Sequence, residues 1–213
     1  GGTVGRRELN WQYAEQYPNE TDAQVRTRRL PLELGIEPVS RAIASGLAGL
    51  AAAGAAKSIC ELGTGVGVSG LALMRYVPEA TLTSIEIEPE HLRQARGVFA
   101  EAGIASSRLR LIEGDAAQVL PRLNLESYDI VVIDADPEQL LDYFESALQI
   151  VRAGGTIAVP GAFAHGRVAD PASRDAVTQN LRDLLTTVGD SPGIAPVLSP
   201  AGDGLLTVPR PTT

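Results

Sequence analysis

Hydrophobic and polar positions follow two different periods along this chain. In residues 6–54, apolar side chains recur at steps of three or four, as with Leu9, Tyr13 and Tyr17, which predicts helices. After Lys57, short apolar runs alternate with longer segments of helical period, which predicts strands and helices in turn. Such alternation is typical of a parallel sheet with helices on both faces. The pattern therefore predicts an α/β fold.

The predicted strands are 58–62, 81–86, 109–113, 130–134 and 156–159, and the predicted helices of this part are 66–76, 89–102, 115–120, 137–151 and 173–188. Two further apolar runs, 195–198 and 205–208, flank a Ser-Pro-Ala-Gly-Asp-Gly turn and predict a terminal hairpin with antiparallel strands. No repeat or low-complexity linker interrupts the 213 residues. We therefore expect one domain, with a helical cap over 1–56 and an α/β core over 57–213.

A glycine-rich turn follows the first predicted strand, in the segment Glu-Leu-Gly-Thr-Gly-Val-Gly-Val-Ser of residues 61–69. Such a turn lets a small molecule touch the backbone, because no Cβ blocks it and the N–H groups of the next helix point outward. Glu61 suits a ligand with cationic and hydroxyl groups, and no Gly-Lys-Ser/Thr follows, which disfavours a triphosphate. Gly65, Gly67 and Gly70 also fit the G-x-G-x-x-G spacing of dinucleotide folds, so the cofactor stays open at this point.

Acidic residues end several of the predicted strands. Ligands of open α/β sheets bind beyond these carboxyl ends, where Glu61, Glu86, Asp115 and Asp134 stand in this chain. Glu86 comes 21 residues after Gly65, where an acid can accept both hydroxyls of a ribose. Asp115 either accepts a hydrogen bond from an adenine amino group or caps the next helix.

Composition limits the partners and the compartment. The net charge of −8 argues against a nucleic-acid surface, and no apolar run is long enough to span a membrane. No secretory signal is visible, and Cys60 is the only cysteine, so we expect no internal disulfide and a cytoplasmic location. Arg26, Arg28 and Arg29 are expected to form the solvated face of a helix, or else to meet an acidic ligand or partner.

Four segments occur in an order that resembles one enzyme family. They are the glycine turn, Ser-Ile-Glu-Ile-Glu-Pro-Glu at 84–90, Glu-Gly-Asp-Ala at 113–116 and Tyr-Asp-Ile-Val-Val-Ile-Asp-Ala-Asp at 128–136. Together with 35–40, 165–170 and 202–206, they resemble the S-adenosylmethionine (SAM)-dependent O-methyltransferases of the catechol and caffeoyl-CoA type. The resemblance implies a Rossmann-like class I methyltransferase fold, a doubly wound seven-stranded, mostly parallel sheet with an antiparallel last strand and N-terminal helices.

The resemblance also implies where SAM would bind. The methionine part would lie against the glycine turn and Ser69, the ribose at Glu86, the adenine at the ends of the second and third strands, and the reactive end at Asp134. Val39 and Ser40 would form the edge that closes over the cofactor. The implied cofactor-binding residues are Val39, Glu61, Gly63, Thr64, Gly65, Ser69, Glu86, Ile87, Asp115, Ala116 and Asp134.

Two family features are replaced in this chain. Members of the family usually bind a divalent metal through the aspartate that corresponds to Asp134 and an Asp-Asn pair after the next strand, which here is Pro160-Gly161. Neither residue has a side-chain ligand, so we expect no divalent metal, with backbone carbonyls or Asp136 as alternative donors. The family's catalytic lysine corresponds to Pro137, and Lys57, the only lysine, lies at the wrong end of a strand.

Two residues remain as candidates for the base that takes the proton of an acceptor hydroxyl. One is Asp134, whose carboxylate is free if no metal binds to it. The other is His165, which lies in a Gly/Ala-rich loop after the fifth strand; the alternative role of His165 is packing within that loop. His91 falls inside a predicted surface helix and is not expected to take part. Asp136 is expected to cap the helix that starts at Pro137.

The leading hypothesis is therefore metal-free methyl transfer from SAM to a hydroxyl of a small acceptor, aromatic or otherwise, with contacts from residues 8–38 and 161–170. The alternatives are a degenerate homologue that binds SAM without catalysis, and an NAD-dependent oxidoreductase. Glu61, the helical N-terminus and the hairpin count against the oxidoreductase. Because members of the family tend to form homodimers, the Ala/Leu-rich segment 42–56 either buries an interface or packs on the sheet.

Overall fold

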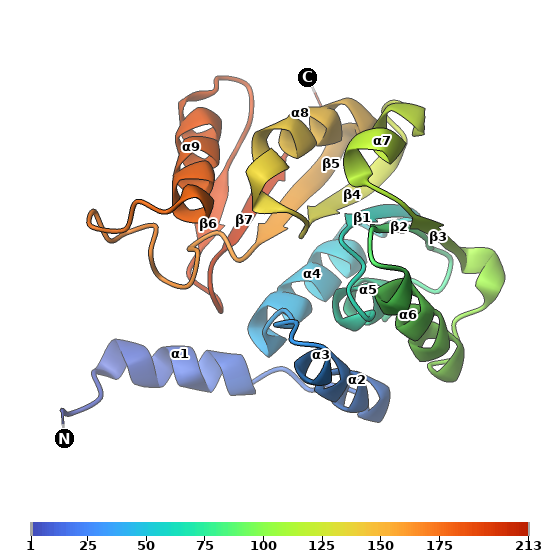
Figure 1. Cartoon of the computed structure of the whole chain (residues 1–213), viewed down its shortest axis with the longest axis horizontal. Helices are drawn as coiled ribbons and strands as arrows, with labels where there is room; N and C mark the ends of the chain where they lie inside the picture. Colours follow the sequence, from blue (N-terminus) through green and yellow to red (C-terminus); the bar gives the residue numbers. More distant parts are fainter. Residues whose placement is uncertain (1, 213) are drawn as a thin grey trace.

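A single sheet of seven strands organises residues 2–212, which the computed structural model describes (Figure 1). The strands are β1 (Ser58–Leu62), β2 (Thr81–Glu86), β3 (Leu109–Glu113), β4 (Tyr128–Ile133), β5 (Val151–Pro160), β6 (Val197–Ser199) and β7 (Leu205–Pro209). Their order is β3-β2-β1-β4-β5-β7-β6. The first five strands pair in parallel, and β7 pairs antiparallel with β5 and with β6. The predicted mostly parallel sheet with an antiparallel last strand is confirmed.

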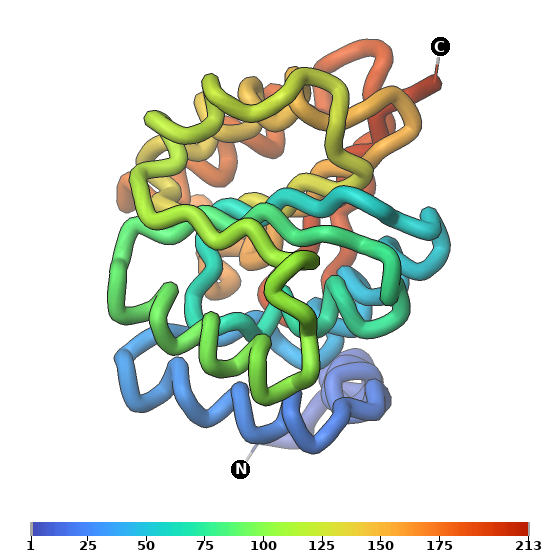
Figure 2. The backbone as a smooth tube through the Cα atoms, turned by 90° about the vertical axis from the view of Figure 1, so that its right-hand side faces the viewer, coloured from blue at the N-terminus to red at the C-terminus, as the bar shows by residue number. Residues whose placement is uncertain are grey.

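Helices cover both faces of the sheet (Figures 1 and 2). One face is covered by α4 (Arg41–Ala53), α5 (Val68–Met74) and α6 (Pro89–Glu101), and the other by α7 (Ala116–Val119), α8 (Leu140–Ile150) and α9 (Ala176–Asp190). Side chains along a strand alternate between the faces, so Ile59 of β1 packs with α4–α6, whereas Cys60 and Leu62 pack with α7–α9. The same alternation points Glu61 toward α5. Short 3-10 turns are η1 (Ser106–Arg108), η2 (Leu120–Arg122) and η3 (Pro137–Gln139).

The N-terminal segment forms three helices, α1 (Arg6–Gln16), α2 (Asp22–Thr27) and α3 (Arg29–Glu33), on the same side as α4–α6 (Figure 2). The predicted helical character is confirmed, but Leu9, Tyr13 and Tyr17 are each more than half exposed. Helix α4, in contrast, packs beside α5, and its side chains Ile43 and Leu47 are buried in the core between these helices and the sheet. Of the two alternatives for segment 42–56, packing inside the molecule is therefore the one observed.

Strand β5 is longer than its sequence predicts. Residues 152–155 read Arg-Ala-Gly-Gly and favour a turn, yet β5 already begins at Val151, which pairs with Tyr128 before the register shifts. This stretch is held from both sides, because Arg152 forms an ion pair with Asp129 and the N–H of Arg210 donates to the Gly155 carbonyl at 2.8 Å. Within residues 2–212, no helix has both the length and the apolar content that a membrane crossing requires.

Candidate functional site

Two adjoining pockets open where the parallel strands end. The smaller pocket, of about 300 Å³, lies over the glycine turn. The larger pocket, of about 810 Å³, extends toward β5, the loop after it and α1. Glu37, Pro38, Val39, Asp134 and Ala135 line both. The structure thus offers two neighbouring binding spaces with a shared wall.

The glycine turn is pressed against the end of β4. A Cβ on Gly63, whose φ is +87°, would lie 1.9 Å from the carbonyl oxygen of Asp134, so only glycine fits there. On the next helix, a Cβ on Gly70 would lie 2.7 Å from Cζ of Phe99, which explains this glycine by close packing of α5 on α6. Gly65, with a φ of +54°, has open space beside it and lines the smaller pocket.

Glu61 lies beneath the smaller pocket and does not form part of its wall. The side chain is fully buried, and its carboxylate accepts hydrogen bonds from the hydroxyls of Ser69 and of Ser84, the latter at 2.9 Å. The hydroxyls of Thr64 and Ser84 are 2.6 Å apart. Thr64 and Ser69 do line the pocket, so Glu61 is linked to the pocket wall directly through the hydroxyl of Ser69, and through Ser84 to the hydroxyl of Thr64.

Burial of Glu61 raises its pKa to about 7. The hydrogen bonds from Ser69 and Ser84 oppose this shift, whereas the charges of Asp134 and Glu86 add to it. Three carboxyl groups of this region therefore repel one another, and a cationic ligand would relieve that repulsion.

Glu86 is held rigidly at the end of β2. Its Oε1 accepts the N–H of Gly65 at 2.8 Å, and its Oε2 accepts the N–H of Glu88 at 3.1 Å. The side chain is almost buried yet lines the smaller pocket. His91 Nδ1 is 3.9 Å from Glu86 Oε2, and His91 also lines this pocket, although its place in a surface helix gave no such expectation. Its position in the first turn of α6, at the ligand end of the sheet, is the signal that could have identified it.

The far end of the smaller pocket is formed by Ile87, Asp115 and Ala116, as the sequence predicts. Asp115 caps α7, since its Oδ1 accepts the N–H of Ala117 at 3.0 Å. The two alternatives for Asp115 are therefore compatible, because the same side chain caps the helix and lines the pocket.

Asp134 stands at the junction of the two pockets. Asp134 is solvent-exposed and lines both pockets. Within residues 2–212, no hydrogen bond to its carboxylate is formed. The protein around it desolvates the carboxyl group, and this effect, with the charge of Glu86, raises the pKa of Asp134 to about 6. Asp134 is thus a free carboxylate that can accept a proton near neutral pH.

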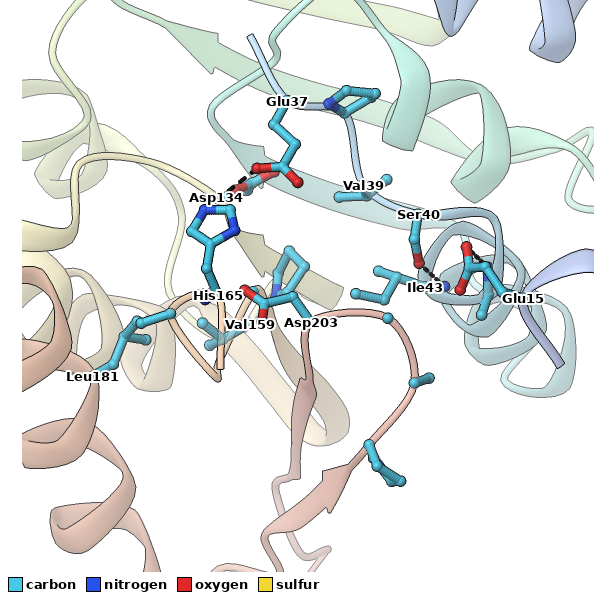
Figure 3. A pocket seen from close by; sticks show the side chains of 18 of the residues that line it. Glu15, Glu37, Val39, Ser40, Ile43, Asp134, Val159, His165, Leu181 and Asp203 are labelled. Carbon is cyan, nitrogen blue, oxygen red and sulfur yellow. Dashed lines mark hydrogen bonds and ion pairs between the residues drawn. The ribbon is translucent and has the colours of Figure 1, made fainter. Parts of the chain in front are cut away.

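His165 lies on the rim of the larger pocket (Figure 3). Its Nε2 is 3.3 Å from Oε2 of Glu37, and both side chains are largely exposed. The backbone has a φ of +56° at His165, and Asp203 accepts the N–H groups of His165 at 2.7 Å and Gly166 at 3.1 Å. Asp203 therefore fixes this loop. The Gly-Asp-Gly motif of 202–204 is the sequence signal for it.

The donors around Asp134 do not fit a divalent metal. Pro160 and Gly161 line the larger pocket without side-chain ligands, and Asp136 uses its Oδ1 to accept the N–H of Glu138 at 3.0 Å as the cap of η3. In the part of the chain that the structure describes, no group of three or more His, Cys, Asp or Glu side chains is arranged to hold a metal ion. Capping by Asp136 is confirmed, and the expectation of a metal-free site stays a prediction.

Val39, predicted to close over the cofactor, lines both pockets, whereas Ser40 lines only the larger one and caps α4. The carbonyl of Val39 accepts a hydrogen bond from Arg28, whose guanidinium also pairs with Glu20 at 2.8 Å. The expectation that Arg28 belongs to a solvated helix face is therefore wrong. Its half-buried side chain holds the segment that carries Val39 in place.

Lys57 lies at the amino end of β1, away from both pockets.

Comparisons with known proteins agree with this geometry. The family model for O-methyltransferases matches residues 19–210. A provisionally named O-methyltransferase of Mycobacteroides abscessus is 41% identical over 199 residues, which are 93% of each chain. One of Mycobacterium tuberculosis is 42% identical over 206 residues, which are 96% of this chain and 92% of the relative.

Solved structures share the fold over nearly the whole chain. A protein of Corynebacterium glutamicum has a TM-score of 0.88 at 28% identity, covering 97% of this chain and 98% of its own. The O-methyltransferase TomG of Streptomyces achromogenes, involved in tomaymycin synthesis and solved with SAM, has a TM-score of 0.83 at 25% identity, covering 95% and 96%. Both the family match and the curated relatives span almost all of the sequence, so this chain belongs to the O-methyltransferase family.

Proposed function

We propose that this protein is a SAM-dependent O-methyltransferase that binds SAM in the smaller pocket and a small hydroxylated acceptor in the larger one. The observation that carries the proposal is the position of Asp134, which opens onto both pockets. Family membership and the SAM complex of TomG support the choice of cofactor. SAM supplies a methyl group on a sulfonium, and a hydroxyl in the larger pocket can approach it across Asp134.

The lining of the smaller pocket supports SAM as its ligand. The open backbone at Gly65 and the hydroxyls of Thr64 and Ser69 suit the methionine end, and the fixed carboxylate of Glu86 suits the ribose. Ile87, Asp115 and Ala116 suit the adenine. SAM carries a sulfonium and an ammonium cation, which the carboxyl groups of Glu61, Glu86 and Asp134 would attract. These assignments stand on geometry and charge together.

Asp134 is proposed as the base that takes the proton of the acceptor hydroxyl. Its carboxylate has no hydrogen-bond partner among the described residues, and its pKa of about 6 keeps it largely ionised at neutral pH. His165, which contacts the carboxylate of Glu37 on the rim of the pocket, is the second candidate for this base. Because methyl transfer is an in-line displacement, the pocket walls contribute by holding the hydroxyl at the right distance and angle. We propose that no divalent metal takes part, since the side chains around Asp134 lack the donors.

Calorimetric titration with SAM, S-adenosylhomocysteine (SAH) and NAD tests the cofactor proposal. We expect saturable binding of SAM and SAH and none of NAD. Tight binding of NAD without the other two would overturn it. Methyl transfer to a panel of phenols and catechols then tests catalysis itself, in a chain where Pro160, Gly161 and Pro137 replace the family's metal ligands and lysine.

Three further parts of the proposal concern the whole protein. We propose that the helices of residues 1–56 and the core of residues 57–213 form one methyltransferase domain. We propose that the protein works in the cytoplasm, as the single Cys60 supports.

We also propose a homodimer. The apolar side chains that α1 exposes, Leu9, Trp11 and Tyr13, offer a surface for it. Sedimentation equilibrium tests the dimer, and a monomer at all concentrations would contradict it.

A further inference from the structure

Nearly all of the titratable side chains that line the larger pocket are acidic; they are labelled in Figure 3. Four of them are carboxylates, those of Glu15, Glu37, Asp134 and Asp203, and the fifth is His165. None of the described residues that line this pocket is a lysine or an arginine. A ligand in this pocket is therefore surrounded by a negative electrostatic potential.

The hydrogen bonds of these carboxylates leave the charge uncompensated. Asp203 accepts two backbone N–H groups, and Glu15 accepts the N–H of Ala42 at 3.1 Å, so the partners of both carboxylates are backbone amides and not cationic side chains. Among the described residues, Glu37 pairs with the imidazole of His165, at 3.3 Å, and with no other cation. The carboxylate of Asp134 forms no hydrogen bond within residues 2–212. Glu37 and Asp134 are thus available to a ligand, one on the rim and one at the junction with the smaller pocket.

Much of the remaining wall is apolar. Trp11, Ile43, Ile133, Leu140, Val159 and Leu181 line the pocket. A volume of about 810 Å³ with such walls is in the range of sites for drug-sized molecules, and it suits an aromatic ring. Gln12, Gln16 and Ser40 add uncharged polar groups, so the charged contacts are left to the carboxylates and His165.

From this charge distribution we infer that the acceptor is a hydroxylated aromatic molecule that carries a basic nitrogen, and that the larger pocket rejects anionic acceptors such as carboxylates and acyl-CoA thioesters. The inference rests on the proposed function, because it names the substrate class of the same site. A cationic group would pair with Glu37 on the rim, whereas an anion would face four carboxylates without one fixed positive charge. The acceptor hydroxyl would lie at Asp134 and the nitrogen toward the rim.

Three catechols that differ in side-chain charge provide the probe. They are 3,4-dihydroxyphenylethylamine, a cation, 3,4-dihydroxyphenylethanol, which is neutral, and 3,4-dihydroxyphenylacetate, an anion. Calorimetry of each against the SAH complex at pH 7.5 and low salt is expected to give the tightest binding for the amine. We expect the acetate to bind at least about tenfold more weakly than the amine. Methyl transfer from SAM should follow the same order in kcat/KM.

The variant Glu37→Gln separates a specific contact from the net charge of the protein. It should reduce the preference for the amine over the ethanol severalfold, while binding of the ethanol itself stays within about twofold. Glu79→Gln removes the same charge from an exposed position between α5 and β2, at the opposite end of the sheet, and should leave the preference unchanged. The same loss of preference in both variants would contradict a role of the pocket.

The two proposals fail in different ways. If SAH does not bind, the proposed function itself is wrong. If SAH binds but the three catechols bind equally, or the acetate binds best, or none binds at all, the acceptor class inferred from the pocket charges is overturned and the cofactor proposal stands.

Discussion

The backbone N–H of Gly65 donates a hydrogen bond of 2.8 Å to Oε1 of Glu86. This bond joins the glycine turn after β1 to the carboxyl end of β2, so that the open backbone and the acid meet in one pocket. The second oxygen of Glu86 accepts the N–H of Glu88, which fixes the carboxylate plane. The two residues, which lie 21 positions apart in the sequence, are therefore held together in one wall of the smaller pocket, where we propose that the ribose binds.

Replacement of Glu86 by alanine should weaken SAH binding by roughly tenfold to a hundredfold, because hydrogen bonds to a charged group contribute about 1.5–3 kcal/mol. Glu113→Ala is the matched control. Glu113 pairs in register with Glu86 at the end of the neighbouring strand, but its side chain is exposed and does not line the smaller pocket. Calorimetry on both variants decides the matter, and an unchanged affinity in Glu86→Ala would show that the ribose assignment is wrong.

Gly63→Ala should destabilise the protein by more than about 2 kcal/mol, because its Cβ would overlap the Asp134 carbonyl oxygen and the φ of +87° is strained for alanine. Gly49→Ala serves as the comparison. Gly49 lies on an exposed position of α4 with open space around it, so alanine should leave stability equal or raise it by up to about 1 kcal/mol. Urea unfolding measures both. Similar midpoints for the two variants would contradict the close approach at Gly63.

Stability should fall as the pH rises through the titration of Glu61. Its pKa is raised from 4.5 to about 7 in the folded protein, so between these values the folded state holds a proton that the unfolded state has lost. This stabilisation is complete below about pH 4.5 and is lost by about pH 7, which costs on the order of 3 kcal/mol. Glu61→Gln, which mimics the protonated acid, should flatten the profile of unfolding free energy against pH. Parallel profiles of wild type and variant would refute the shift.

Asp134→Asn should reduce kcat, measured at saturating SAM, by roughly a hundredfold to ten-thousandfold, the usual contribution of a general base. In the wild type, activity should rise with pH through about 6, as the carboxyl group loses its proton, and then level off. The variant should lack this rise. Asp142→Asn, at an exposed position in the first turn of α8 that lines neither pocket, should retain both the rate and its pH profile. If the rise persists in Asp134→Asn and disappears in His165→Gln, the base is His165.

Much of the fold follows from the sequence because short, largely apolar strand segments alternate with longer segments of helical period. The predicted bounds of β1, β2 and β3 agree with the structure residue for residue. The start of β5 could not be predicted in this way. Gly154 and Gly155 favour a turn locally, and the strand is imposed there by long-range partners, such as Arg210 on the terminal strand segment.

The candidate site was predictable where chain order fixes position and not where tertiary contacts do. Glu86 and Asp134 follow strands and therefore had to meet at the carboxyl edge of the sheet. The buried place of Glu61 depends on hydroxyls from two other elements. The role of Arg28 depends on Glu20 and on the Val39 carbonyl. Neither arrangement has a local signal in the sequence.

The central claim is methyl transfer without a metal, and it is tested most directly by following a labelled methyl group from SAM to a catechol acceptor. The reaction is run with the protein treated with EDTA and, in parallel, with added Mg²⁺. We predict the same rate of product formation in both. Product formation that is abolished by EDTA and restored by Mg²⁺ would contradict the account.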